Sequence, residues 1–271
     1  MIKRSLCFVI ILLITMNYNS VNASKSDIYK NMLETNQYTL IYINETQIKD
    51  NENELRLFKE ERYSDYLEKK KLESLTKGAP GEVTLVANEK CFYKEMNYTH
   101  LSECQIEKDS LCYAYSKLYK KDGGVDYYGL NSDGKNGFGL NKNKITPQQV
   151  NKQINYKRYL IDPTMDKLLS PLLPENIKRS NLPKYKKIGE NTLINDYSYE
   201  DYVCQENNHW EIMRYYFQND NFIKIAAASY DITADGKVNN YKKTIMKICK
   251  FTNEIDNNKF ILPLELKING G

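Results

Sequence analysis

The sequence predicts a mainly β (α+β) protein: a strongly curved antiparallel sheet or incomplete barrel, with an amino-terminal helix and additional covering helices. From about residue 187 onward, runs rich in aromatic and β-branched residues alternate with short polar turns. Connections this short force neighbouring strands to pair antiparallel. A second observation is the series of similar short runs after Val83. A third is two longer intervals, near 53–76 and 163–180, that suit helical insertions.

The amino terminus has the features of a secretory signal. "MIKR" supplies a positive start, and "SLCFVIILLITM" is an apolar run too short to span a bilayer as a helix. Val21 and Ala23 occupy the minus-three and minus-one positions of a cleavage site before Ser24. We therefore expect residues 1–23 to be removed, leaving a single β-rich domain over 24–271. No second segment is long and apolar enough for a transmembrane span.

The first part of the mature chain predicts a helix and then a strand. "SKSDIYKNMLETNQ" offers Ser26 as a helix cap, followed by apolar residues at helical spacing. The alternation in "QYTLIYI", residues 37–43, predicts a strand with both faces partly covered. Further on, the doubled "GLN" in residues 129–144 predicts a hairpin, and we expect the leucines after Pro163 to be buried in a crossing connection.

The cysteines of an exported chain can form disulfides. One of the six, Cys7, lies in the signal, which leaves an odd number for pairing. The candidates are Cys91, Cys104, Cys112, Cys204 and Cys249. One bridge is expected within the first three and another between Cys204 and Cys249, although spacing alone leaves the connectivity open. No C-x-x-C occurs, so we expect no metal site.

The composition argues against several function classes. The net charge is only +4, acidic and basic residues are interspersed, and no arginine cluster occurs, so no nucleic-acid partner is expected. The motifs of hydrolases, phosphate-binding loops and dinucleotide-binding folds are missing. The two histidines, His100 and His209, are expected to be structural or surface residues. We therefore expect a protein that is not an enzyme and uses no cofactor.

The most informative stretch is "HWEIMRYYFQNDNFIKIAAASYDI", residues 209–232. It predicts the middle hairpin of the carboxy-terminal meander, with "KFILPLELKI" at its end. Trp210 and Ile212 share one face before the apolar residues shift to Met213, Tyr215 and Phe217. We expect a β-bulge at that shift, bending the strand.

The order of these features resembles a known family. "IGENTLINDYSYEDYVC", "YYFQNDNFIKI" and "IMKICKFTNEIDNNKFILP" resemble the carboxy-terminal half of bacterial envelope proteins related to the outer-membrane lipoprotein carrier fold, and "YKNMLETNQYTLIYI" resembles their amino-terminal helix and first strand. The resemblance covers 28–43 and about 187–263. It implies an incomplete barrel whose concave apolar side is covered by helices and receives acyl chains. Asp196 stands where relatives often have glycine.

The apolar side of this sheet is where we expect a ligand cavity. Its expected lining is Tyr38, Leu40, Tyr42, Trp210, Ile212, Tyr215, Phe217, Ile223 and Ile225. No residue role is carried over from the family, because no position matches a specific binding motif. For each aromatic residue, an ordinary place in the hydrophobic core is the competing interpretation.

Two functions remain as hypotheses. The first is a non-enzymatic protein of the periplasm or cell envelope that binds a hydrophobic ligand, either a lipid or an acylated protein. The alternative is an extracellular or cell-surface, disulfide-linked module of a eukaryotic parasite that binds another protein. The alternative rests on two glycosylation sequons, at Asn44 and Asn97, and on a composition typical of an AT-rich genome.

Overall fold

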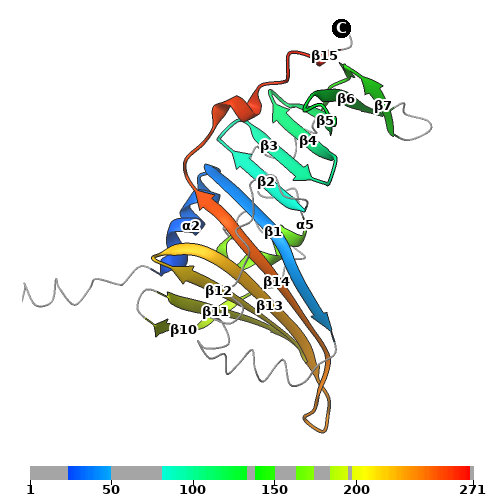
Figure 1. The fold of residues 1–271 in the computed structure, drawn as a ribbon. Helices are drawn as coiled ribbons and strands as arrows, with labels where there is room; N and C mark the ends of the chain where they lie inside the picture. Colours follow the sequence, from blue (N-terminus) through cyan, green and yellow to red (C-terminus); the bar gives the residue numbers. More distant parts are fainter. Residues whose placement is uncertain are drawn as a thin grey trace, which may run out of the picture.

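One antiparallel sheet organises the molecule. The computed structural model describes residues 24–49, 81–132, 138–149, 163–173, 184–194 and 197–268. Within them, 13 strands form a sheet in the order β10-β11-β12-β13-β14-β1-β2-β3-β4-β5-β6-β7, with β9 paired to β5. The predicted mainly β class is confirmed, and the sheet is not closed, because it ends at β10 and at β7 (Figure 1).

The elements before the crossing connection form the amino-terminal helix, the strands of the sheet from β1 to β7 with β9, and the separate short strand β8. They are α2 (Lys25–Glu34), β1 (Tyr38–Lys49), β2 (Glu82–Ala87), β3 (Phe92–Asn97), β4 (Leu101–Lys108), β5 (Leu111–Tyr119), β6 (Val125–Ser132), β7 (Phe138–Lys142), β8 (Lys144–Ile145) and β9 (Gln148–Gln149). The predicted signal, 1–23, and the helix expected near 53–76 lie outside the described residues.

The later elements form the crossing connection (α5 and η1), the long meander (β10–β14) and the carboxy-terminal segment (η2 and β15). They are α5 (Pro163–Leu168), the 3₁₀ turn η1 (Ser170–Leu172), β10 (Lys186–Ile194), β11 (Tyr197–Glu206), β12 (His209–Gln218), β13 (Asn221–Ile232), β14 (Val238–Thr252), the 3₁₀ turn η2 (Asn257–Phe260) and β15 (Lys267–Ile268). In the described part of the chain, no helix combines the length and apolar character needed to cross a membrane.

The two halves of the sheet meet where β14 pairs with β1. Leu40 of β1 lies opposite Phe251 on one side and opposite Leu85 of β2 on the other. Two register shifts interrupt the β1–β14 ladder, and such irregularities increase the bend and twist of a strand pair. Strands from the two ends of the chain therefore lie side by side in the middle of the sheet (Figure 1).

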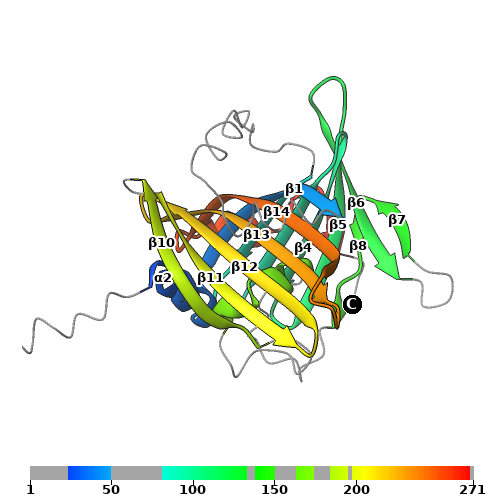
Figure 2. The ribbon, with the colours of Figure 1, turned by 90° about the horizontal axis from the view of Figure 1, so that it is seen from below.

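Helices cover one face of β11–β14, β1 and β2, and we call this face of the sheet the inner face. Figure 2 shows α2 and α5 inside the curve formed by β10–β14. The core here, called the inner core, joins the buried side of α2, the leucines after Pro163 and large side chains of β1, β2 and β11–β14. Met165, Leu169 and Leu173 are each at most 3% exposed, so the expected burial of this crossing connection is confirmed.

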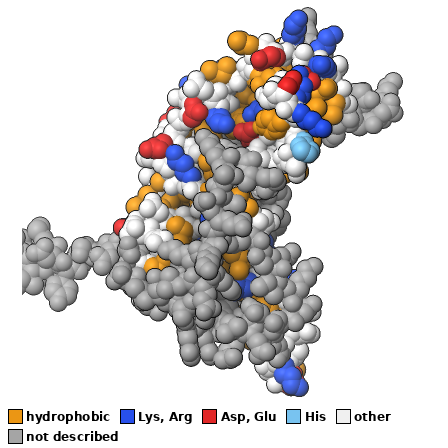
Figure 3. All heavy atoms as spheres, in the orientation of Figure 1, with side chains coloured by type: hydrophobic (Ala, Val, Ile, Leu, Met, Phe, Trp, Pro, Cys, Tyr) orange, Lys and Arg blue, Asp and Glu red, His pale blue; other side chains and the backbone are white. Residues whose placement is uncertain are grey.

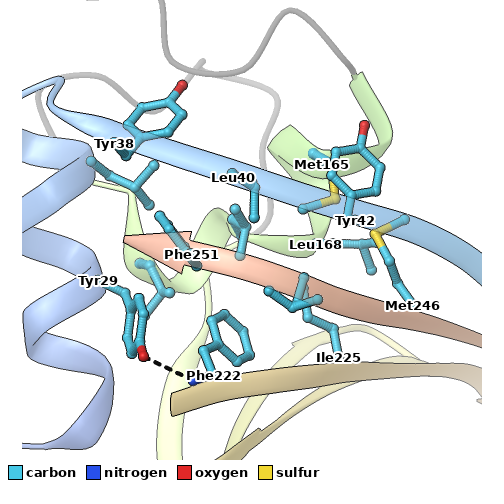
Figure 4. Close-up of a cluster of buried hydrophobic side chains, with 14 of the residues drawn as sticks. Tyr29, Tyr38, Leu40, Tyr42, Met165, Leu168, Phe222, Ile225, Met246 and Phe251 are labelled. Carbon is cyan, nitrogen blue, oxygen red and sulfur yellow. Dashed lines mark hydrogen bonds between the residues drawn. The ribbon is translucent and has the colours of Figure 1, made fainter. Parts of the chain in front are cut away.

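Tyr29 fastens α2 to the sheet. Its ring lies 5.3 Å from that of Phe222 and 4.9 Å from that of Phe251, measured between centroids (Figure 4). Its hydroxyl accepts the Phe222 backbone N–H at 2.8 Å and donates to the Asp220 carbonyl at 3.0 Å. The predicted helix is confirmed, but its cap is Ser24 and not Ser26. Ser26 lies inside the helix, where its hydroxyl donates to Glu200 at 2.7 Å.

The opposite, outer face of β2–β5 is covered by the end of the chain. Ile145, Phe260 and Leu266 pack there with Val86 and Tyr93 in what we call the outer core. The expectation that residues 259–268 continue the meander is therefore wrong: β14 pairs with β1, and β15 forms a short parallel pair with β8. Pro263 lacks a backbone donor, which makes this segment a poor inner strand.

A glycine permits the close approach of β8 to the sheet. A Cβ atom on Gly129 of β6 would overlap the carbonyl oxygen of Lys144. We expect Gly129→Ala to push β8 away and to lower the free energy of unfolding by about 1–3 kcal/mol, measured by urea denaturation. The matched control is Gly139→Ala on the paired strand, since its Cβ would meet nothing within 4 Å. Equal stability of the two variants would contradict this account.

Candidate functional site

The residues expected to line one cavity lie on both faces of the sheet. Tyr38, Leu40, Tyr42, Tyr215, Phe217 and Ile225 belong to the inner core. Trp210, Ile212 and Ile223 lie on the outer face of the meander, in a separate cluster around Tyr216 and Tyr241. The strand β12 is buried continuously from Glu211 to Phe217, with regular pairing to β11. The expected bulge after Ile212 is therefore wrong: side chains on both faces of β12 are buried, and the register shift falls between Tyr216 and Phe217.

An open groove occupies the inner face beyond the inner core. Met96 of β3 packs against that core and lies opposite Glu103 of β4, which lies opposite Ser116 of β5. Since directly paired residues point to the same face, this row carries the inner face across to β6 and β7. The resulting cavity has a volume of about 550 Å³. Its apolar lining includes Met96, Leu101, Ala114, Leu118, Tyr128, Leu130 and Leu140.

Two leucine pairs form the apolar lining of the groove. Leu101 of β4 lies opposite Leu118 of β5, and Leu130 of β6 lies opposite Leu140 of β7. The second pair comes from the doubled "GLN", whose two copies pair antiparallel; its tip at 133–137 lies outside the described residues. Leu118 is 38% and Leu140 64% exposed. Figure 3 shows hydrophobic side chains among charged ones at the end of the molecule that carries these strands.

The groove is open because the two ends of the sheet are covered on opposite faces. The inner core ends at β2 and at Phe92 and Met96 of β3. Beyond it, the described elements that pack on the sheet are β8 and the carboxy-terminal segment, on the outer face. The apolar groove lining therefore faces away from these covering segments.

Polar side chains are fewer than apolar ones in the groove lining. Lys94, Glu103, Gln105 and Ser116 contribute to the lining. The Tyr98 hydroxyl donates to the Met96 sulfur at 2.9 Å and to Glu103 Oε2 at 3.3 Å. A ligand with a long apolar part and a small polar part would match this distribution.

A buried ion pair lies behind the groove, on the outer face. Glu95 Oε1 and Lys117 Nζ are 2.7 Å apart, and the Tyr93 hydroxyl donates to Glu95 Oε2 at 2.7 Å. Lys259 of η2 lies 3.3 Å from the same carboxylate. Burial raises the pKa of Glu95, but the hydrogen bonds and charges of Lys117, Tyr93 and Lys259 outweigh it, and the pKa is lowered. The charge of Glu95 thus ties the carboxy-terminal segment to β3 and β5.

The five described cysteines are free thiols, and the expected disulfides are absent from the described residues. Cys204 and Cys249 lie on β11 and β14, with two strands between them. At about 4.8 Å per strand they are too far apart to bridge. Cys104 lies in the outer core. Cys112 points to the inner face, because it is two residues from Ala114 on β5 and alternate residues of a strand share a face. Cys91 precedes β3 and is four residues before Glu95, the residue that lies opposite Cys104.

His209 takes part in a surface network at the start of β12. Its Nδ1 lies 2.7 Å from Asp231 Oδ1, and Asn240 donates to Asp231 Oδ2 at 2.6 Å. Among the described residues, no three His, Cys, Asp or Glu side chains are grouped so as to hold a metal ion. No family model matches the sequence, and a search of curated proteins finds no match.

Glu95 predicts a specific acid sensitivity. Its pKa is lower in the folded than in the unfolded chain, so its contribution is complete above the ordinary value of 4.5 and is lost as the pH falls through the folded value. We expect Glu95→Gln to lower the free energy of unfolding at pH 7 by about 3 kcal/mol, because Lys117, whose side chain is only 19% exposed, keeps its charge without its closest partner. The variant should lose less stability than the wild type between pH 7 and pH 3.

Denaturant unfolding at several pH values measures both effects. Glu254→Gln is the control, because Glu254 is 77% exposed in its ion pair with Lys250, and such pairs contribute little. Parallel curves for the wild type and Glu95→Gln over this pH range would show that Glu95 is not a source of the acid sensitivity.

Proposed function

We propose that this protein is an exported, non-enzymatic binding protein that holds an acyl chain, from a lipid or an acylated protein, in the groove on the inner face of β3–β7. The observation that carries the proposal is the apolar cavity of about 550 Å³ on this face, where none of the described helices packs. Ligand cavities commonly measure about 300–1,000 Å³ and combine apolar walls with a few polar groups. Exposed apolar side chains gathered in one concave place favour binding over an accidental surface feature.

The side chains of the groove suit a flexible chain. Four leucines and Met96 are among its lining residues, and methionine adapts its shape to a ligand because it is unbranched. The few polar groups leave room for a polar head at the edge. The groove is built from residues 94–140, between the two segments that resemble the lipoprotein carrier fold, so its own geometry supports the proposal independently of that resemblance.

Export remains part of the proposal. Cleavage before Ser24 would leave α2 and its cap intact, since the helix begins at Lys25. The Ser24 hydroxyl also donates to Glu200 at 2.6 Å, which would hold a new amino terminus against β11. An envelope location is therefore compatible with a folded mature chain.

Two observations disfavour the alternative of a disulfide-linked, glycosylated surface module. The described cysteines are free. Asn97 is only 7% exposed, and its side chain accepts a hydrogen bond from Ser102 at 2.6 Å and donates to Glu82 at 3.4 Å. A glycan on Asn97 would have to remove this side chain from the sheet. Asn44 is exposed on β1 and is not affected by this argument.

A charge inside the groove should abolish acyl-chain binding. We expect Leu118→Asp to reduce the affinity for the neutral apolar dye N-phenyl-1-naphthylamine at least tenfold, because a bound chain would desolvate the new carboxylate. Dye fluorescence measures the affinity, and displacement by a neutral monoacylglycerol tests for an acyl chain. Leu264→Asp is the control, since Leu264 is 96% exposed and not part of the groove.

Either of two results would overturn the proposal: equal dye affinity in Leu118→Asp and Leu264→Asp, or failure of the monoacylglycerol to displace the dye. Native mass spectrometry of the wild type gives a second readout. A lipid-sized adduct should be present on the wild type and on Leu264→Asp, and missing from Leu118→Asp.

A further inference from the structure

A second cavity lies on the inner face over β12–β14, beneath α5. Its volume is about 320 Å³. Its floor is a row of three paired residues, Met213 of β12, Ala227 of β13 and Thr244 of β14. Lys167 and Leu168 of α5 form its wall, and the Leu168 carbonyl is fixed by a hydrogen bond from the Tyr215 hydroxyl at 2.8 Å.

The cavity exists because β13 carries a run of small residues at this point. On the inner face, Ala227 and Ser229 of the run "AAAS" (residues 226–229) replace the large side chains found elsewhere on this strand, such as Phe222 and Ile225. Ala227 therefore leaves space between the sheet and α5. Met213 and Leu168 give the space an apolar part.

A fixed carboxylate lies at the edge of the cavity. Glu211 is 7% exposed, and its Oε1 is 2.6 Å from Lys167 Nζ while its Oε2 accepts the Tyr185 hydroxyl at 2.6 Å. His209 Nε2 lies 3.5 Å from Oε1. Burial raises the pKa of Glu211, but Lys167 and Tyr185 outweigh it and the pKa is lowered. Both oxygens are thus engaged, and Glu211 serves to position Lys167.

The groups left for a ligand are mainly donors. An ammonium group carries three N–H bonds, so Lys167, whose side chain is 50% exposed, keeps donors beyond the one directed at Glu211. The hydroxyls of Ser229 and Thr244 also line the cavity. Lys242 lies opposite Ser229 in the sheet and adds positive charge nearby. A ligand that fits must offer acceptors and, by preference, negative charge.

We propose that this cavity binds a small aliphatic carboxylate, with its carboxylate at Lys167, Ser229 and Thr244 and its chain against Leu168, Met213 and Ala227. The volume, near the lower end of ligand cavities, suits a medium-length chain rather than a complete lipid. The site is separate from the groove, because the two share no lining residue.

The test compares three ligands of one chain length, octanoate, octanol and octylamine, by isothermal titration of the full mature chain. We expect octanoate to bind at least tenfold more tightly than octanol, and octylamine to bind no better than octanol. Lys167→Met should lower octanoate affinity at least tenfold while leaving octanol affinity unchanged. Lys167→Arg should restore most of the octanoate affinity, since it keeps the charge next to Glu211.

Matched variants separate this site from general effects of charge or folding. Lys250→Met removes a lysine of similar exposure, 46%, that is also paired with a glutamate, and it should not alter octanoate binding. Thr244→Val keeps the shape and removes one hydroxyl, so a several-fold loss is expected even if Lys167→Met folds poorly. The groove variant Leu118→Asp should bind octanoate normally.

Three outcomes would overturn the inference: no saturable octanoate binding at millimolar concentration, equal affinity for octanoate and octanol, or octanoate affinity unchanged in Lys167→Met and Thr244→Val alike. None of these depends on dye binding at the groove. The two sites can therefore fail or succeed independently.

Discussion

The pairing of β1 with β14 is the contact on which the rest of the structure depends. It runs from Thr39 opposite Thr252 to Lys49 opposite Lys242, and it joins segments from nearly opposite ends of the chain. Without it there would be two separate meanders, each with an exposed apolar edge strand. The Thr39 hydroxyl donates to the Glu254 carbonyl at 2.6 Å, which holds the point where the chain leaves β14 for the outer face. Such a distant pairing carries a large loop-closure cost and needs strong local strands on both sides.

The joined sheet is then stabilised from opposite sides at its two ends. Helices bury the inner face of β11–β14, β1 and β2, and the carboxy-terminal segment buries the outer face of β2–β5. On the outer face of the meander, Arg214 is 3% exposed and makes a two-pronged contact with Asp201, at 2.7 and 2.8 Å, under the ring of Tyr199. A buried charge held in this way requires that neighbouring strands keep their register. Among the described elements, this change of covered face is what leaves the groove open.

Local signals in the sequence were sufficient for much of this structure. The capped helical pattern after Ser24 gives α2, the short polar turns give β10–β14, and the doubled "GLN" gives the β6–β7 hairpin. Contacts distant in sequence could not be predicted in this way. Nothing local distinguishes a β14 that pairs with β1 from one that pairs with residues 259–268. The cysteines illustrate the same limit, because their separation depends on strand order and facing, which spacing does not reveal.

The candidate sites show a further limit, which concerns side-chain size. The predicted cavity lining consisted mostly of large aromatic and aliphatic residues, yet Tyr38, Tyr215 and Phe217 are packed in the inner core and are 0% exposed. Space is left where residues are small, as at Ala227, or where no described element covers a face, as at Leu118 and Leu140. The run "AAAS" was the available signal for the first, and the leucines of β4–β7 were the signal for the second. Aromatic content therefore marked the packed part of the sheet, and the sites lie beside it.

The position of the groove at an edge of the sheet bears on what it can hold. The groove reaches β7, the last strand, where Leu140 is exposed, whereas the small cavity lies between strands of the interior under α5. A chain bound in the groove can leave over this edge, so the molecule to which it is attached need not be enclosed. The cavity under α5 lies over β12–β14, away from that edge, and its volume of about 320 Å³ is smaller than that of the groove. If both proposals hold, the same sheet face provides one site open to a tethered chain and one for a small free molecule.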